Sequence, residues 1–143
     1  MTRISSIVMP LIVGGFLTTA MAAFGQQCDI LFQGTPVVSP DPVTAGRDIT
    51  LSYVIHNNGP GNAGTSQTLI HIENSSGTAI AGEIFSAPAV NAGANSSTQY
   101  CTLTVPAGSL TGTYTAYAFL DIEGQLDESD TSNDRSPDVN FTV

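Results

Sequence analysis

The side chains best suited to chemistry lie near the end of the chain, in a segment rich in carboxylates. Its acidic residues are Asp121, Glu123, Asp127, Glu128, Asp130 and Asp134, and the amide of Asn133 lies among them. Carboxylate and amide oxygens are the ligands that Ca²⁺ prefers, so the segment is a candidate calcium site. The spacing does not match an EF-hand loop, because the first, third and fifth positions counted from Asp121 are Asp, Glu and Gln.

The same side chains also have a structural interpretation, which their residue types favour. Short polar side chains in turns commonly satisfy backbone groups, and we expect Glu128, Ser129, Thr131 and Asn133 to do so within this loop. We therefore assign no metal ligand and no cofactor, and we predict a structural role for Glu128 and Asn133. Calcium binding is the alternative, with its ligands drawn from Asp121, Glu123, Asp127 and Asp130.

Other residue types that carry chemistry in enzymes form no recognisable set. The two histidines, His56 and His71, fall on different predicted strands and lack the spacing of a zinc site. No serine lies in a G-x-S-x-G segment, and the chain contains no lysine, which excludes Schiff-base and P-loop chemistry. Paired carboxylates for glycoside hydrolysis would need a cleft, which a small β-sandwich rarely offers. The sequence thus predicts a protein that is not an enzyme.

Residues 1–25 have the pattern of a secretory signal peptide. Arg3 supplies a positive start, residues 7–17 form an apolar run, and residues 18–25 provide the small side chains that a signal peptidase requires. We therefore expect an exported protein that is secreted or held at the cell surface, or that stays in the periplasm.

Cleavage after Ala22 and cleavage after Gly25 both fit the signal pattern. An uncleaved membrane anchor is the alternative, and Pro10 within the apolar run weakens it. Removal of the signal leaves residues 26–143, a length that suits one domain with one core.

The charge balance narrows the range of partners. The formal net charge is −9 at pH 7, and Arg47 and Arg135 are the only arginines beyond the signal peptide. Such a surface repels the phosphates of nucleic acids and of anionic lipids. We expect neither nucleic acid nor, after signal cleavage, a membrane as partner.

Two cysteines in an exported chain suggest one disulfide. Cys28 shares a strand face with Ile30, and Cys101 shares one with Leu103, so both thiols are expected to point into the core. We predict an intrachain bond between Cys28 and Cys101. Two buried free thiols, or a bond between neighbouring subunits, are the alternatives.

Alternating runs rich in Thr, Val, Ile and Tyr recur along the chain, separated by clusters of Gly, Pro, Asn and Asp. No helical period is visible. The runs predict seven strands, at residues 29–33, 48–57, 65–73, 78–85, 97–105, 112–122 and 137–143. Seven short strands with no helix between them predict an all-β protein, a single antiparallel β-sandwich.

The sixth predicted strand gives the sharpest structural signal. Tyr114 follows Gly112 by two residues, which is typical of the tyrosine corner of immunoglobulin-like domains, where the hydroxyl holds the preceding loop. An antibody domain would have a cysteine at Ala116 and a core tryptophan, and this chain has neither. The fold is therefore expected to be immunoglobulin-like in topology only.

These segments together resemble the CARDB family, the cell-adhesion-related domain found in bacteria. The resemblance covers nearly all of residues 26–143 and rests on four segments: CDILF, VTAGRDITLSYVIHNNGPGNAG, AGSLTGTYTAYAFLD and LDESDTSND. The chain departs from the family pattern in its two cysteines and in Asp134, where a second Asn is common.

The resemblance implies a seven-stranded sandwich in surface or secreted proteins, with an adhesive or structural role and no catalytic residues. Its expected partner is a further copy of itself, in an oligomer or fibre, or another component of the cell surface or matrix. The alternative is an extracellular module that binds Ca²⁺ or a soluble ligand through the acidic loop.

Overall fold

The computed structural model describes residues 25–143, and all of its regular structure is β-strand. The strands are β1 (Ile30–Phe32), β2 (Val37–Ser39), β3 (Asp48–Tyr53), β4 (Ile55–Asn57), β5 (Ser66–Glu73), β6 (Ala79–Ala87), β7 (Gln99–Thr104), β8 (Thr113–Phe119) and β9 (Val139–Thr142). Within the described residues, no helix could cross a membrane. The predicted signal peptide, residues 1–25, lies outside this part of the chain except for Gly25.

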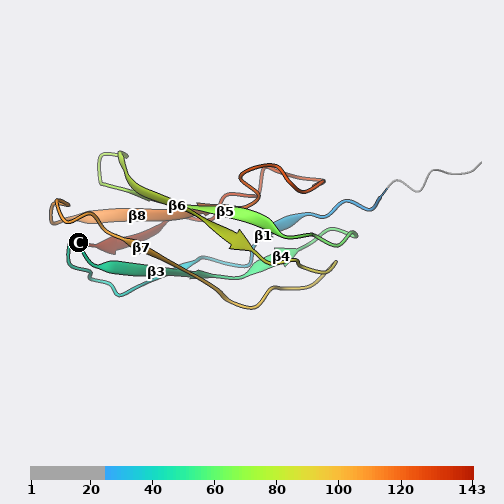
Figure 1. The fold of residues 1–143 in the computed structure, drawn as a ribbon, viewed down its shortest axis with the longest axis horizontal. Coiled ribbons are helices and arrows are strands. Elements are labelled where there is room, and N and C mark those ends of the chain that lie inside the picture. Colours follow the sequence, from blue (N-terminus) through green and yellow to red (C-terminus); the bar gives the residue numbers. More distant parts are fainter. Residues whose placement is uncertain (1–24) are drawn as a thin grey trace, which may run out of the picture.

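The strands form two layers that face each other (Figure 1). One sheet has the order β6-β5-β8-β9, the other has the order β2-β3-β7, and β1 pairs with β4; all these pairings are antiparallel. Alternation along each strand sends every second side chain inward, where the fully buried set includes Ile49, Leu51, Ile70, Ile72 and Phe141. The predicted antiparallel sandwich is confirmed.

Nine strands replace the seven predicted because the second predicted strand, residues 48–57, is divided into β3 and β4, and because β2 is an additional strand that was not predicted. β3 and β4 are one run broken only at Val54, whose carbonyl accepts a hydrogen bond from Gln33 N at 2.9 Å. β1 and β2 both pair with this run, and Gly34 lies between them at φ 81°. β2 lies among prolines at the edge of its sheet, and an edge strand tolerates proline because one side of its backbone needs no partner.

The buried amide of Asn57 joins three segments at one end of the sandwich. Its Oδ1 accepts hydrogen bonds from Asp29 N at 3.1 Å and Gly59 N at 3.0 Å. Its Nδ2 donates to Gly61 O at 2.8 Å and Val90 O at 3.0 Å. Both N–H donors and both lone pairs of the amide are thus occupied, which explains how a polar side chain is fully buried there.

The glycines that follow Asn57 allow this loop to touch the start of the chain. A Cβ added at Gly61 would lie 1.8 Å from Gln26 O, and one at Gly59 would lie 2.6 Å from Asp29 N. Neither position has room for a side chain. The NNGPGNAG segment is therefore a close-packed support for residues 26–29 as well as a connection between strands.

The structure does not form the predicted disulfide, and Cys28 and Cys101 are separate buried thiols. Cys101 Sγ lies 3.5 Å from the hydroxyl of Tyr53, whose ring packs edge-on against Phe32 with centroids 5.3 Å apart. Cys28 precedes Phe32 by four residues, which is roughly 13 Å along an extended strand. A disulfide needs Cα atoms within about 7 Å, so facing the same core was not sufficient for pairing.

Burial raises the pKa of both thiols, which disfavours the reactive thiolate. The Cys28 Sγ instead lies 3.6 Å from the carbonyl oxygen of Asp127. The alternative of two buried free thiols describes the structure.

Asn57→Ala is expected to lower the free energy of unfolding by about 3 kcal/mol, because it leaves the buried N–H groups of Asp29 and Gly59 and the buried carbonyl of Gly61 without partners. Chemical denaturation measures this loss. Asn62→Ala is the matched control, since Asn62 is exposed and accepts only from Ala92 N. Equal stability of the two variants would contradict the role assigned to Asn57.

Candidate functional site

The connection between β8 and β9 makes a long excursion at one end of the sandwich, and its first turn is built around Asp121. This residue is buried and has a positive φ of 40°, which is uncommon for a residue other than glycine. Its carboxylate accepts hydrogen bonds from Gln125 N and Leu126 N, both at 2.9 Å. The side chain thus fixes the loop on which the following acidic residues stand.

The excursion then runs beside the start of the chain and pairs with it. Cys28 forms a parallel bridge with Glu128, with Cys28 N donating to Asp127 O at 3.2 Å and Ser129 N donating to Cys28 O at 2.9 Å. Glu128 extends this pairing with its side chain, since Oε2 accepts from Ile30 N at 3.0 Å. Residues about a hundred positions apart are therefore held side by side.

Asp29 lies at the junction of the loop and the amide support described above. Its carboxylate accepts from Asn133 Nδ2 at 2.8 Å and from Asn58 Nδ2 at 3.1 Å. Asp29 is 8% exposed, so these two amides replace water around a buried charge.

Three side-chain oxygens of the β8–β9 excursion are buried and have no hydrogen-bond partner: Glu128 Oε1, Asn133 Oδ1 and Asp134 Oδ1. The contact between Asn133 Nδ2 and Asp29 orients that amide and leaves its oxygen without a donor. Buried oxygens without partners are rare in proteins because each has lost its water. We call Asp29, Glu128, Asn133 and Asp134 the acidic cluster.

Burial and mutual repulsion act strongly on the acidic cluster. Burial, followed by the charges of Glu128 and Asp121, raises the pKa of Asp134 to about 7. Burial, only partly offset by the hydrogen bond from Ile30 N, also raises the pKa of Glu128. At neutral pH Asp134 is therefore partly protonated, whereas an isolated carboxylate would be ionised, and a cation in that place would relieve the same repulsion.

The structure brings together a different set of residues from the calcium ligands that the sequence suggested. Of that set, Asp121 binds loop backbone, while Glu123, Asp127 and Asp130 are exposed and accept from Gln125, Gln27 and Ser132. Among residues 25–143, no group of three or more His, Cys, Asp or Glu side chains is arranged to hold a metal ion. The unpartnered oxygens come from two carboxylates and one amide instead.

Glu128 and Asn133 were expected to satisfy backbone groups of their own loop, and the structure gives them a different task. Glu128 accepts from the backbone of β1, and Asn133 donates to Asp29. Sequence reasoning missed Asp29, which lies far away along the chain. The only signal for it was the CDILF segment, where the residue stands beside a strand that had to pair with something.

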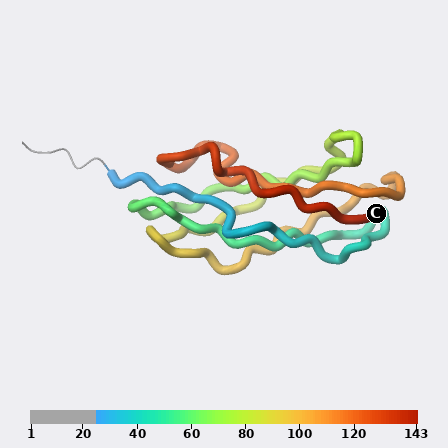
Figure 2. The backbone as a smooth tube through the Cα atoms, turned by 180° about the vertical axis from the view of Figure 1, so that it is seen from behind, coloured from blue at the N-terminus to red at the C-terminus, as the bar shows by residue number. Residues whose placement is uncertain are grey.

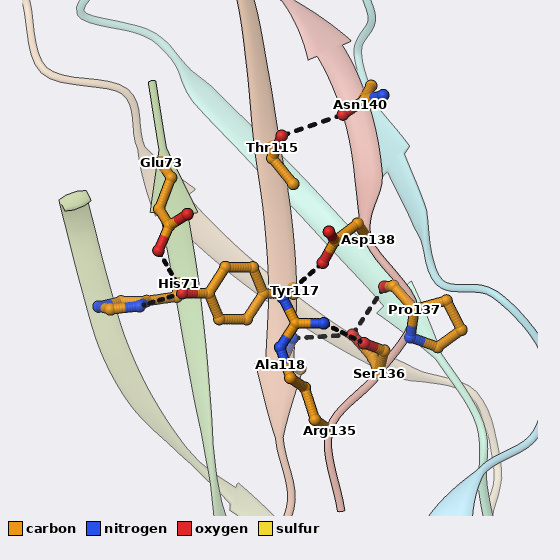
Figure 3. Close-up of polar contacts among 10 residues, drawn as sticks. All are labelled: His71, Glu73, Thr115, Tyr117, Ala118, Arg135, Ser136, Pro137, Asp138 and Asn140. Atoms are coloured by element: carbon orange, nitrogen blue, oxygen red, sulfur yellow. Dashed lines mark hydrogen bonds and ion pairs between the residues drawn. The ribbon is translucent and has the colours of Figure 1, made fainter. Parts of the chain in front are cut away.

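A second polar network covers the outer face of the larger sheet (Figure 3). The Tyr117 hydroxyl donates its one proton to Glu73. It also lies 3.0 Å from Nδ1 of His71, so the imidazole N–H must be the donor in this second contact. Arg135 lies over the Tyr117 ring at 4.1 Å and forms an ion pair with Asp138 at 2.6 Å. Burial, followed by the bond to Glu73, raises the pKa of Tyr117. The network joins β5, β8 and the segment before β9.

The two histidines make separate hydrogen bonds. His71 contacts the Tyr117 hydroxyl, whereas His56 Nδ1 contacts Asn95 Oδ1 at 2.7 Å. At the opposite end of the sandwich, the Tyr114 hydroxyl donates to Leu110 O at 2.8 Å, which is the geometry of a tyrosine corner. Gly112 lies in the same loop and exchanges two backbone hydrogen bonds with Val143.

Comparison with protein-family models assigns this chain to a family. The family model for CARDB matches residues 35–136. The chain belongs to the CARDB family. No curated protein matches it in sequence.

Solved structures share the CARDB fold at low sequence identity. The CARDB domain of the PF1109 protein from Pyrococcus furiosus, in complex with di-metal ions, is 17% identical with a TM-score of 0.54, over 83% of this chain and 89% of that chain. A domain assigned to a cell-surface protein of Methanosarcina acetivorans is 13% identical with a TM-score of 0.53, over 82% and 92%.

β-Glucosidase 3B from Thermotoga neapolitana, in complex with α-D-glucose, contains a similar sandwich. It is 16% identical with a TM-score of 0.55, and the similarity covers 81% of this chain but only 16% of the enzyme. At such identities the likeness concerns the fold alone.

The raised pKa of Asp134 predicts how stability changes with pH. The folded state holds this proton more tightly than the unfolded chain does, between the ordinary pKa of 3.8 and the folded value of about 7. The stabilisation is therefore complete below the lower value and is lost as the pH rises through the upper one. We expect the melting temperature to fall across this interval.

Asp134→Asn should remove most of the fall in melting temperature. It should also raise the free energy of unfolding at pH 8, by no more than about 1–2 kcal/mol because solvent screens part of the repulsion. Thermal melts across the pH range measure both effects. Glu83→Gln removes the same charge from an exposed position on β6 and serves as the control. A variant with the pH profile of the wild type would show that Asp134 titrates normally.

Proposed function

We propose that this CARDB protein is a non-enzymatic extracellular module with an adhesive or structural role, exported with removal of residues 1–25. The observation that carries the proposal is the extent of the family match, since residues 35–136 make up most of the sandwich. The domain of Methanosarcina acetivorans, which is assigned to a cell-surface protein, supports the location. The acidic, lysine-free composition is suited to a protein that stays soluble outside a cell.

The edge of the larger sheet supports a self-associating form of this module. β6 is the outermost strand of that sheet, spans Ala79–Ala87 and has Glu83 as its only charged residue. It contains no proline or lysine, the residues with which monomeric proteins commonly protect an edge, and Ile84 is 51% exposed on it. A second copy of the chain that adds its own edge strand would continue the sheet, and repetition would build an oligomer or fibre.

Self-association is expected to depend on concentration and on the β6 edge. Light scattering over a concentration series, with electron microscopy of the most concentrated samples, should show oligomers of the mature protein. Ile84→Lys should weaken association about tenfold or more, because it places a hydrated charge against the incoming strand.

Ile122→Lys is the matched control, since Ile122 is 41% exposed and follows β8 rather than lying in β6. Monomers alone at every concentration would contradict the self-assembling form and leave an adhesive module that acts as a single copy.

A second candidate function, calcium binding, is favoured by one observation: the three buried oxygens of the acidic cluster that have no partner. Ca²⁺ accepts amide as well as carboxylate oxygens, so Asn133 can serve beside Glu128 and Asp134. A cation would replace the proton that the raised pKa of Asp134 implies. The di-metal complex of the Pyrococcus furiosus domain shows that one CARDB domain binds metal ions, and we extend this to the present chain by proposal.

Calcium should raise the melting temperature at pH 8, and at a hundredfold excess over its dissociation constant it should add about 2.7 kcal/mol to stability. Calorimetry with CaCl₂ should show heat for the wild type and none for Glu128→Gln. Glu123→Gln is the control, because Glu123 is exposed and contacts only Gln125. No heat and no melting shift for the wild type would exclude the site.

A further inference from the structure

A surface pocket lies at the end of the sandwich opposite to the acidic cluster. Its volume is about 490 Å³, within the range of small-ligand sites. One wall is the turn between β5 and β6, and the other is the loop between β7 and β8 that carries the tyrosine corner. Both connections lie at the same end of the ribbon in Figure 1. The residues that decide its chemistry are Ser75, Ser76, Ser109, Leu110, Thr111 and Thr113.

The pocket is uncharged, which is unusual in a chain with a net charge of −9. None of the residues that line it is Asp, Glu, Lys, Arg or His. An ionic ligand would lose its hydration there and gain no ion pair in return. The ligand that suits this pocket is therefore neutral.

Hydroxyl groups dominate the polar part of the lining. The side chains of Ser75, Ser76, Ser109, Thr111 and Thr113 each offer one donor and two acceptor positions. Leu110, which is 81% exposed, supplies an apolar surface beside them. A ligand that matches the hydroxyl side chains and the apolar surface of Leu110 has many hydroxyls of its own and one apolar face. A neutral sugar ring has both features.

Both walls of the pocket are held by hydrogen bonds within the chain. On one side, Asn74 Oδ1 accepts from Ser76 N and Thr78 N, both at 3.0 Å. On the other, Ser109 N donates to Pro106 O at 2.9 Å, and the Tyr114 hydroxyl holds the carbonyl of Leu110. A site that is already ordered loses little entropy when a ligand binds, which favours binding by few contacts.

We propose that this pocket binds a neutral saccharide. The inference rests on the proposed adhesive function, for which it names the class of ligand. A small pocket without an exposed aromatic platform gives weak binding to a single sugar, and repeated copies of the module would raise the avidity. The acidic cluster takes no part, since it lies at the other end of the molecule.

Nuclear magnetic resonance of the ¹⁵N-labelled protein tests the proposal with a panel of neutral disaccharides: maltose, cellobiose, lactose and N,N′-diacetylchitobiose. At least one should shift the amide signals of residues 74–76 and 109–113. The double variant Ser109→Ala/Thr111→Val should raise its dissociation constant at least about fivefold, because two hydroxyl hydrogen bonds are lost.

The control variant Ser52→Ala/Thr102→Val makes the same chemical change on the outer face of the smaller sheet, next to Tyr100, which is 72% exposed. It should bind as the wild type does. The proposal is overturned if no disaccharide shifts the pocket signals, if binding survives in the Ser109/Thr111 variant, or if only glucuronate or inorganic phosphate shifts them. Any of these results leaves the proposal on self-association untouched, because that is measured at β6.

Discussion

The amide of Asn57 is the interaction on which the acidic end of the molecule depends. It holds the backbone of Asp29, and Asp29 in turn binds the amides of Asn58 and Asn133. Carboxylates repel one another, so an acidic cluster packs closely only where neutral groups hold some of its members in place. Here a neutral amide that the core encloses completely supports a group of charges just outside it.

This arrangement also explains why the β8–β9 excursion is ordered although it belongs to neither sheet. Asp121 closes its first turn, the parallel bridge between Cys28 and Glu128 fixes its middle, and Leu120 N donates to Asp134 O at 2.9 Å near its end. The last two contacts tie the excursion to Cys28, just before β1, and to Leu120, at the end of β8. The loop is therefore a continuation of the core packing rather than an appendage to it.

The sequence predicted what depends on local pattern and missed what depends on distant partners. Alternation in residues 48–57 and the Gly112-x-Tyr114 spacing indicate strands and a corner directly, because side-chain direction repeats every two residues. The predicted disulfide is absent because strand parity gives the sheet face to which a cysteine side chain points, but not the position of the cysteine along the strand. The acidic set was misassigned because charge density does not reveal which carboxylates of a loop turn inward, and Asp29 is remote from them in the chain.

The described chain begins at the acidic end, and Val143 lies at the other end of the long axis (Figures 1 and 2). A pull on residue 25 and Val143 would therefore run along the strands. Hydrogen bonds of an antiparallel ladder stand perpendicular to that direction, so the load would fall on many of them at once in shear. Such a ladder cannot be opened one bond at a time from these points. With the termini in these positions, a tension applied at residue 25 and Val143 would be transmitted through the strands of the sandwich.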